Sequence, residues 1–133
     1  MRKSFVLAAL LVLLSLPVGA QPRILTGFAP AGTADVLVRL LAEPAAAGLG
    51  ARPVVENRTG ANGFIAAEAA ARGPADGSVV VLCVMGMMSI APELPGARLP
   101  IDPRADLAGV ATLALSPYGL VVGAGGPHRT VED

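Results

Sequence analysis

The residues best placed to do chemistry lie in one stretch, RILTGFAPAGTAD, at residues 23–35. The pattern of this stretch predicts a short buried strand, a Pro/Gly turn and the first turn of a helix. N–H groups at a helix N-terminus have no partner within the helix, and the helix dipole adds partial positive charge there. Strand, turn and helix start together predict a cradle that holds a small carboxylate without transforming it.

Asp35 is the acidic residue of this stretch, and its position allows three interpretations. With Gly32 as the N-cap, the carboxylate can reach back to the Gly32 N–H, as in a capping box. With Thr33 as the N-cap, it favours the helix dipole. It can also contact the ligand directly, through an amino group or bridging waters. A general base for acyl transfer is disfavoured, because no nucleophile or second base accompanies it.

A second glycine-rich turn, NRTGANG, occupies residues 57–63 and superficially resembles a phosphate loop. It lacks the Lys-Ser/Thr pair of a P-loop, and no G-x-G-x-x-G pattern occurs in the first turn, so a nucleotide site is disfavoured. Asn57 and Arg58 are expected to orient this turn. Arg58 is also a candidate partner for a carboxylate.

The sulfur and imidazole groups indicate neither a catalytic pair nor a metal site. The single cysteine, Cys83, is far in sequence from the single histidine, His128, and it excludes an intramolecular disulfide. One Cys and one His form no convincing metal cluster, and we expect no cofactor. Cys83 is predicted to be a small buried hydrophobe. Met87 and Met88 are either core residues or the adaptable apolar wall of a pocket.

The apolar pattern predicts alternating strands and helices that would position these residues. Strands are predicted at residues 24–28, 53–56, 78–84, 109–115 and 119–122, helices from residue 33 to the glycines at 48 and 50 and over 64–72, and a loop over 85–90. This order predicts an α/β fold with a mainly parallel sheet, right-handed crossovers and flanking helices. Ligands bind at the carboxyl ends of such strands, so the loops 29–35, 57–63 and 85–89 are expected to share one rim.

Residues 1–20 read as a cleavable signal peptide. Arg2 and Lys3 precede the apolar run 5–16, and Val18-Gly19-Ala20 is a small-residue cleavage signal. The run is shorter than the roughly 20 residues of a membrane span, which favours export over the alternative of an uncleaved anchor. Beyond residue 20 there are 8 basic and 10 acidic residues and no basic run, so nucleic acid is disfavoured as a partner.

Three segments, FAPAGTADVLVRLLAE (28–43), PVVENRTGANGFIAAEAAARGPADG (53–77) and LPIDPRADLAGVATL (99–113), carry a family resemblance. In order and spacing they resemble the Bug family, the periplasmic solute-binding receptors of tripartite tricarboxylate transporters. The resemblance implies a monomeric, two-lobed binding protein of the type II-like periplasmic class, without enzyme activity. Such a protein closes on a small carboxylated solute and delivers it to membrane transporter subunits.

The resemblance also implies which positions hold the ligand, largely through backbone groups and waters. In this chain they are Pro30, Ala31, Gly32, Thr33, Asp35, Gly86 and Met87. Ala31 stands where the family usually has Gly, and Thr59 and Asn62 replace its usual Pro and Gly. The methionine-rich loop 84–88 replaces small polar residues, which favours a more apolar ligand.

The resemblance divides the chain into a signal peptide (1–20), a partial first lobe (21–116) and a crossover toward a second lobe (117–133). The last six residues, HRTVED, look like the start of a helix, which favours a truncated chain. Three functions remain open: a carboxylate receptor for a tripartite tricarboxylate-type transporter, a truncated remnant that binds nothing, and an exported enzyme. The enzyme is disfavoured because no nucleophile–base or metal constellation is present.

Overall fold

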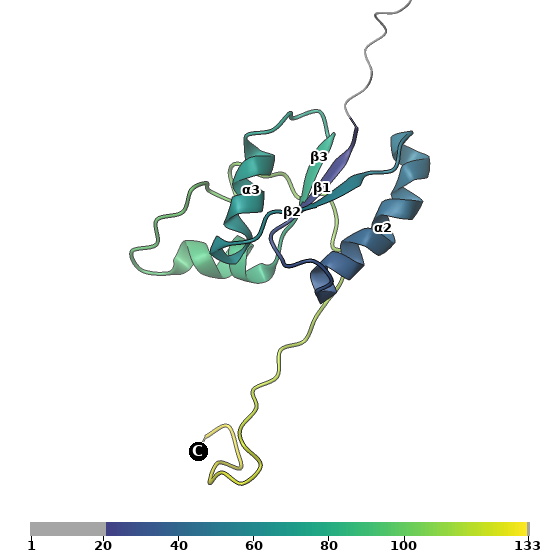
Figure 1. Ribbon diagram of the computed structural model, residues 1–133. Coiled ribbons are helices and arrows are strands. Elements are labelled where there is room, and N and C mark those ends of the chain that lie inside the picture. The colour runs from purple at the N-terminus through teal and green to yellow at the C-terminus, as the bar shows by residue number, and fades with distance from the viewer. Residues whose placement is uncertain (1–20, 133) are drawn as a thin grey trace, which may run out of the picture.

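The computed structural model describes residues 21–132, which form a three-stranded sheet with a helix on each face (Figure 1). The elements in chain order are β1 (Arg23–Thr26), α2 (Thr33–Leu49), β2 (Val54–Asn57), the short helix η1 (Ala61–Gly63), α3 (Phe64–Ala71), β3 (Val79–Leu82) and the short helices η2 (Gly86–Ile90) and η3 (Ala91–Glu93). The predicted signal peptide lies outside the described residues.

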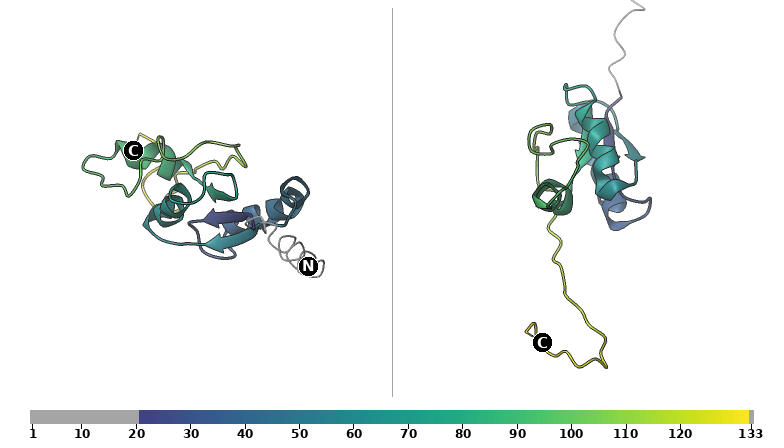
Figure 2. Two further views of the ribbon diagram at one scale, coloured as in Figure 1. Left: turned by 90° about the horizontal axis from the view of Figure 1, so that it is seen from above. Right: turned by 90° about the vertical axis from the view of Figure 1, so that its left-hand side faces the viewer.

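The sheet is entirely parallel, in the order β2-β1-β3, which confirms the predicted α/β class. Arg23 of the central strand pairs with Val54 on one side and with Val79 on the other. The chain therefore moves outward in one direction through α2 and in the opposite direction through α3. Because crossovers between parallel strands are right-handed, this reversal places the two helices on opposite faces, as Figure 2 also shows.

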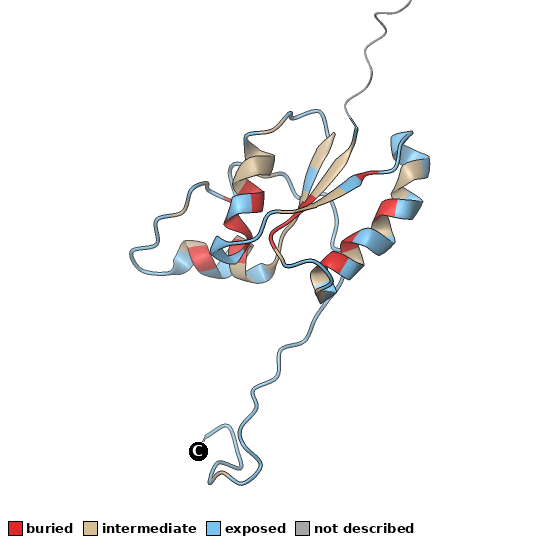
Figure 3. Cartoon of the chain, viewed as in Figure 1, coloured by how far each residue is buried: buried red, intermediate tan, exposed pale blue. Residues whose placement is uncertain are grey.

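The core has a part on each side of the sheet. On one side α2 buries Val38 and Ala42, one turn apart on the same stripe of the helix. On the other side Phe64 and Ala67 of α3 pack with Met87 in a buried cluster. The buried positions gather around the sheet and the helices, whereas the segment after them is exposed almost throughout (Figure 3).

Helix α2 begins and ends where the sequence indicates. Gly32 is its N-cap, and Gly50 follows its last residue in the left-handed conformation, with φ of 71°. Such a C-terminal Gly satisfies the helix end without a Cβ penalty. Pro44 lies inside the helix, which nonetheless continues to Leu49.

Two sequence predictions are wrong. Residues 109–115 and 119–122 form no strands; there the chain runs extended away from the sheet, and Leu115 and Leu120 are 92% and 85% exposed. A β-rich pattern forms a strand only against a neighbouring strand, and none pairs with this segment. Residues 85–90 are not a loop either, because Gly86–Ile90 makes one wide helical turn. Directly before it, the Met87 and Met88 N–H groups both donate to the Val84 carbonyl at 3.0 Å.

Among the described residues, no helix combines the length and the apolar character needed to cross a membrane.

Candidate ligand-binding site

The three loops that the sequence places on one rim do meet at the carboxyl edge of the sheet. Gly27, directly after β1, touches Gly63 of the second loop so closely that a β-carbon on Gly27 would lie 2.2 Å from the Gly63 Cα. A β-carbon on Gly63 would in turn lie 3.7 Å from the Met87 Sδ, and one on Gly86 would lie 3.3 Å from the Asn62 Nδ2. The first loop therefore packs on the second, and the second packs on the third.

The direction of the chain makes the loops diverge at this edge. The loop after β1 leads to α2, while the loop after the adjacent strand β3 leads to η2, which packs with α3 on the opposite face. Neighbouring parallel strands whose loops diverge to opposite faces form a topological switch point, where α/β proteins bind ligands. The second loop runs from β2 to α3 and crosses the end of β1 at this point.

The first loop presents backbone N–H groups at the start of α2. Gly32 caps the helix in an extended conformation and no side chain caps it, and the first helical hydrogen bond runs from the Val36 N–H to the Gly32 carbonyl at 2.9 Å. The N–H groups of Thr33, Ala34 and Asp35 therefore form the open first turn of a 17-residue helix. The N–H of Gly32 is directed to the Ala29 carbonyl, at 3.2 Å.

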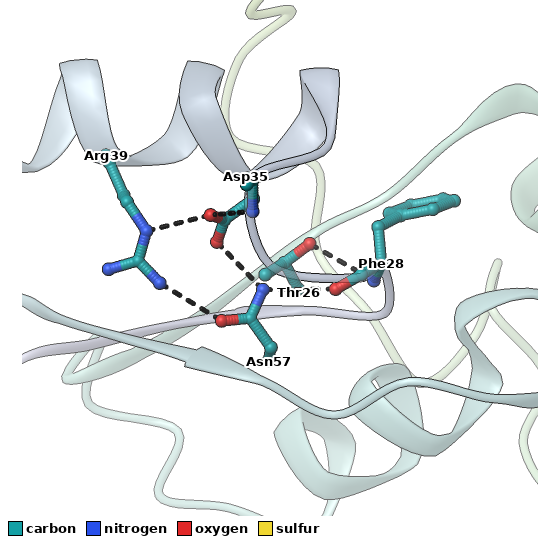
Figure 4. A network of polar contacts seen from close by, with 6 residues as sticks. Thr26, Phe28, Asp35, Arg39 and Asn57 are labelled. Atoms are coloured by element: carbon teal, nitrogen blue, oxygen red, sulfur yellow. Dashed lines mark hydrogen bonds and ion pairs between the residues drawn. The ribbon is translucent and has the colours of Figure 1, made fainter.

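Asp35 stands at the centre of a hydrogen-bond network that holds this loop in place (Figure 4). Its side chain is only 3% exposed. One carboxylate oxygen accepts from the Ala31 N–H at 2.8 Å and from Arg39 Nε at 2.9 Å, and the other accepts from Asn57 Nδ2 at 2.8 Å. With Gly32 as N-cap, the carboxylate does reach back along the loop, but its donor is the N–H of Ala31 and not that of Gly32.

Asn57 connects three segments with one side chain. Its amide nitrogen donates to the Phe28 carbonyl at 3.0 Å as well as to Asp35, and its amide oxygen accepts from Arg39 at 3.1 Å. As the last residue of β2, Asn57 thereby ties that strand to the first loop and to α2. The sequence predicts that Asn57 orients its own glycine turn, whereas its side chain bonds instead to the first turn and to α2.

The electrostatics of the network leave the helix start open to an anion. The hydrogen bond from Arg39, followed by those from Asn57 and the Ala31 N–H, holds the pKa of Asp35 well below its usual range. The carboxylate is therefore ionised, and the adjacent guanidinium of Arg39 compensates its charge. Because the pair is neutral, Asp35 opposes an incoming carboxylate at the α2 N-terminus only weakly.

The other predicted site residues differ in exposure. Pro30, Ala31 and Thr33 are exposed at the rim and Gly86 is half-buried. Met87 is 1% exposed and its side chain belongs to the core cluster with Phe64. Ligand contact by these residues stays a prediction.

Arg58 is engaged within the protein, since its guanidinium pairs with Glu56 at 2.9 Å. Glu56 also pairs with Arg23 on the neighbouring strand, at 3.3 Å. The hydrogen bonds from Arg58 and then from Arg23 lower the pKa of Glu56, against a desolvation effect that raises it. The candidate carboxylate partner of the sequence analysis is therefore part of an ion-pair ladder across the sheet.

Arg39 was missed by the sequence reasoning. The spacing of Asp35 and Arg39, four positions apart in a helix, is a recognised signal for an ion pair and could have revealed it. The link from Arg39 to Asn57 joins residues far apart in the sequence, and no local pattern carries it.

The site consists of backbone and amide groups, without a metal constellation. In the part of the chain that the structure describes, no three His, Cys, Asp or Glu side chains are placed to hold a metal ion. Two shallow hollows lie elsewhere: one of about 380 Å³ beside Arg39, Arg52 and Val55, and one of about 410 Å³ beside Leu99 and Arg104.

Comparison with known proteins identifies the family. Residues 24–133 match the tripartite tricarboxylate transporter family receptor. A UPF0065 protein of Bordetella bronchiseptica is 32% identical over 138 residues, which cover 98% of this chain and 41% of that protein. The protein BugT of Bordetella pertussis is 35% identical over 82 residues, which cover 57% of this chain and 25% of BugT.

Solved structures show the same fold. A periplasmic transporter superposes with a TM-score of 0.58 at 34% identity, over 66% of this chain and 29% of that one. The periplasmic binding protein BugD superposes with a TM-score of 0.52 at 38% identity, over 56% of this chain and 24% of BugD. The chain thus spans less than half the length of the relatives that it matches. Sequence and fold agree that the protein belongs to the tripartite tricarboxylate transporter receptor family, together with the Bug proteins.

Proposed function

We propose that the protein is a periplasmic receptor that captures a small carboxylate-containing solute for a tripartite tricarboxylate-type transporter. Family membership supports the class of function, and two structural relatives are described as periplasmic proteins. Residues 1–20 would direct export and be removed. The receptor performs no chemistry on its solute, and it works as a monomer with the transporter's membrane subunits.

The observation that carries this proposal is the open N-terminus of α2 at the switch point of the sheet. A carboxylate there accepts hydrogen bonds from the N–H groups of Thr33, Ala34 and Asp35, reinforced by the helix dipole. Pro30, Ala31 and Gly32 shape the approach, and the Asp35 network holds them. Gly86 and Met87 contribute backbone groups to the opposite side of the site, because the side chain of Met87 is buried in the core.

We assign residues 21–116 to a first lobe and residues 117–133 to the connection toward a second one. In this arrangement the rim of the three loops is one half of the binding site. The solute bridges this rim to the second lobe and leaves when the lobes separate.

Isothermal titration calorimetry of the protein with di- and tricarboxylates, amino acids and aromatic acids tests the proposal. Thr33→Pro sharpens the test, because proline suits the first helical position and the extended Gly32 before it, yet lacks the N–H. Loss of one hydrogen bond to a charged group corresponds to about 1.5–3 kcal/mol, or roughly 10- to 100-fold in affinity. Thr33→Ala is the matched control, since it removes the side chain and keeps the N–H.

The expected result is that the unaltered protein and Thr33→Ala bind the same acid with similar affinity, while Thr33→Pro binds it more weakly at an unchanged melting temperature. Failure of the unaltered protein to bind any acid of the panel would contradict the receptor function. Equal affinities of all three proteins would contradict the role of the helix start alone.

A further inference from the structure

Strand β2 lies at one edge of the sheet, because the strand order within residues 21–132 is β2-β1-β3. The Val54 N–H donates to the Pro22 carbonyl at 2.8 Å, on the side of β1. Alternate residues of a strand bond to opposite sides, so the N–H groups of Val55 and Asn57 are directed outward, away from β1. An edge of this kind is a template on which another extended segment can pair.

A hollow of about 380 Å³ lies beside this edge, between β2 and α2. Its lining includes two guanidinium groups, that of Arg39 from α2 and that of Arg52 just before β2. Their side chains are 50% and 67% exposed, and the carboxylates that pair with them, Asp35 and Glu43, lie outside the lining. The hollow therefore presents positive charge to an occupant.

The excess of arginine extends along the whole strand. Arg58 follows β2 and Arg23 lies on the neighbouring strand, and both pair with one carboxylate, Glu56. Of the 8 basic and 10 acidic residues beyond residue 20, four arginines and three carboxylates thus surround β2. This edge is the basic side of an otherwise acidic protein, and electrostatic complementarity favours an acidic partner there.

We propose that the β2 edge docks an extended, acidic segment of a partner protein, which adds to the sheet as a further strand. Backbone hydrogen bonds to the outward groups of β2 supply the binding, as in other cases of strand addition. A second copy of the chain fits less well, because edge-to-edge pairing would bring the arginines of both copies together. The proposal adds a protein partner to the receptor and does not depend on which solute it binds.

The two faces of the sheet determine which sequence the segment needs. Asn57 bonds to α2 through Asp35 and Arg39, so its face of β2 is the one beside the hollow, and Val54 lies on the other face. Carboxylates at every second position of the added strand therefore meet the arginines of the hollow. The side chains between them lie next to Val54, which is 39% exposed and suits an apolar neighbour.

The test measures binding of the labelled peptide acetyl-TVEVEVT-amide to the protein by fluorescence polarisation. Acetyl-TVQVQVT-amide keeps the alternation and removes the charge. Arg52→Gln removes one guanidinium from the hollow, and Arg72→Gln is the matched control on α3, where the side chain is 73% exposed. Val55→Pro removes an outward N–H, at a kind of position where edge strands tolerate proline. Arg39 is left unchanged because it also holds Asp35.

We expect the acidic peptide to bind about 10-fold more tightly than the neutral one. Arg52→Gln should weaken its binding about 3-fold and Val55→Pro about 3- to 10-fold, whereas Arg72→Gln should leave it unchanged. In NMR spectra of the unaltered protein, the peptide should shift the amide signals of Val55 and Asn57 and leave that of Val54 nearly unmoved.

Equal binding of the two peptides, or equal losses in Arg52→Gln and Arg72→Gln, would overturn the docking surface. So would unmoved signals of Val55 and Asn57, a result that does not depend on how any variant folds. Dimers in sedimentation velocity that Val55→Pro abolishes would show that a second copy occupies the edge, which also overturns the proposal. In each case the capture of a solute is unaffected, because the measurement uses none.

Discussion

Ala31 occupies a position in the first loop where glycine would be more favourable. Its φ of 64° lies in the left-handed region, and the hydrogen bond from its N–H to Asp35 holds it there. An L-residue with a side chain is strained in this region, whereas glycine is not. The loop therefore keeps its shape at the expense of stability, through contacts formed elsewhere.

We expect Ala31→Gly to raise the free energy of unfolding by about 0.5–1 kcal/mol, because relief of left-handed strain exceeds the added entropy of the unfolded chain. Urea-induced unfolding would measure it. The control is the same exchange at Ala47, which is exposed near the end of α2. There glycine should lower the free energy by about 0.5–1 kcal/mol, and a loss at both positions would argue against strain at Ala31.

Asp35 makes the stability of the lobe sensitive to acid. Its pKa is lowered in the folded state, so its contribution is complete above the unfolded-state pKa of about 3.9 and is lost as the pH falls below that value. We expect the free energy of unfolding to begin to fall near pH 5 and to fall most steeply below about pH 3.9, where the unfolded chain binds a proton that the folded state does not. In Asp35→Asn the curve should be shallower and should start lower at neutral pH.

Urea unfolding at a series of pH values would measure both slopes. Glu56 and Asp76 also have lowered pKa values, from Arg58 and from Ser78 respectively, so some slope should remain in the variant. Identical slopes in the two proteins would show that the network does not hold Asp35 ionised.

At the residue scale, sequence reasoning finds what depends on neighbours along the chain. Residues 29–35 leave Gly32 and Thr33 as alternative N-caps, and the structure has Gly32, which makes Asp35 the third residue of the helix. The partnership of Asp35 with Asn57 could not be predicted, because only the parallel pairing of β1 with β2 brings the two together.

At the element scale, the crossing of the first two loops is the tightest contact in the site. The backbones of Gly27 and Gly63 meet with no room for a β-carbon at Gly27. Both sides of this contact are backbone, so a side chain at Gly27 would have to displace the whole second loop. The convergence of the loops therefore depends on the absence of one methyl group.

We expect Gly27→Ala to lower the free energy of unfolding by at least about 2 kcal/mol and to weaken solute binding as the loops separate. Gly48→Ala is the matched control, because nothing lies within 4 Å of a β-carbon at Gly48 and the residue is inside α2. It should stabilise the protein by about 0.5–1 kcal/mol. A Gly27→Ala variant as stable as the unaltered protein would mean that the loops do not pack as described.

The sequence predicts strands correctly where an apolar segment has a neighbouring strand to pair with. Strands β1, β2 and β3 lie inside or within one residue of their predicted ranges, and both long helices are confirmed. The segments 109–115 and 119–122 have the same β-rich composition, yet no strand forms because no neighbour supplies the other half of a ladder. Composition describes what a segment is able to form, and pairing decides whether it does.

At the scale of the whole molecule, a small sheet-and-helix body is joined to a long exposed segment (Figure 1). Val110, Leu115 and Leu120 are each at least 85% exposed.

By hydrogen–deuterium exchange we expect the amides of residues 110–122 to exchange almost at the unprotected rate, since they form no helix or sheet hydrogen bonds. The amides of the central strand β1 should be the best protected. Protection of 110–122 equal to that of β1 would show that the segment pairs with a sheet edge in solution.

The strand order also determines when the fold can form during synthesis. The central strand is the first to be made, yet Arg23 pairs with Val54 on one side and with Val79 on the other. β1 therefore lacks one of its two partners until β3 has emerged, and only then can both ladders close. Long-range pairing of this kind folds slowly and leaves an apolar strand exposed meanwhile. A chain with this topology cannot complete its sheet until β3 has been made, and an incomplete fold is the state that a protein must keep if it is to be translocated before it folds.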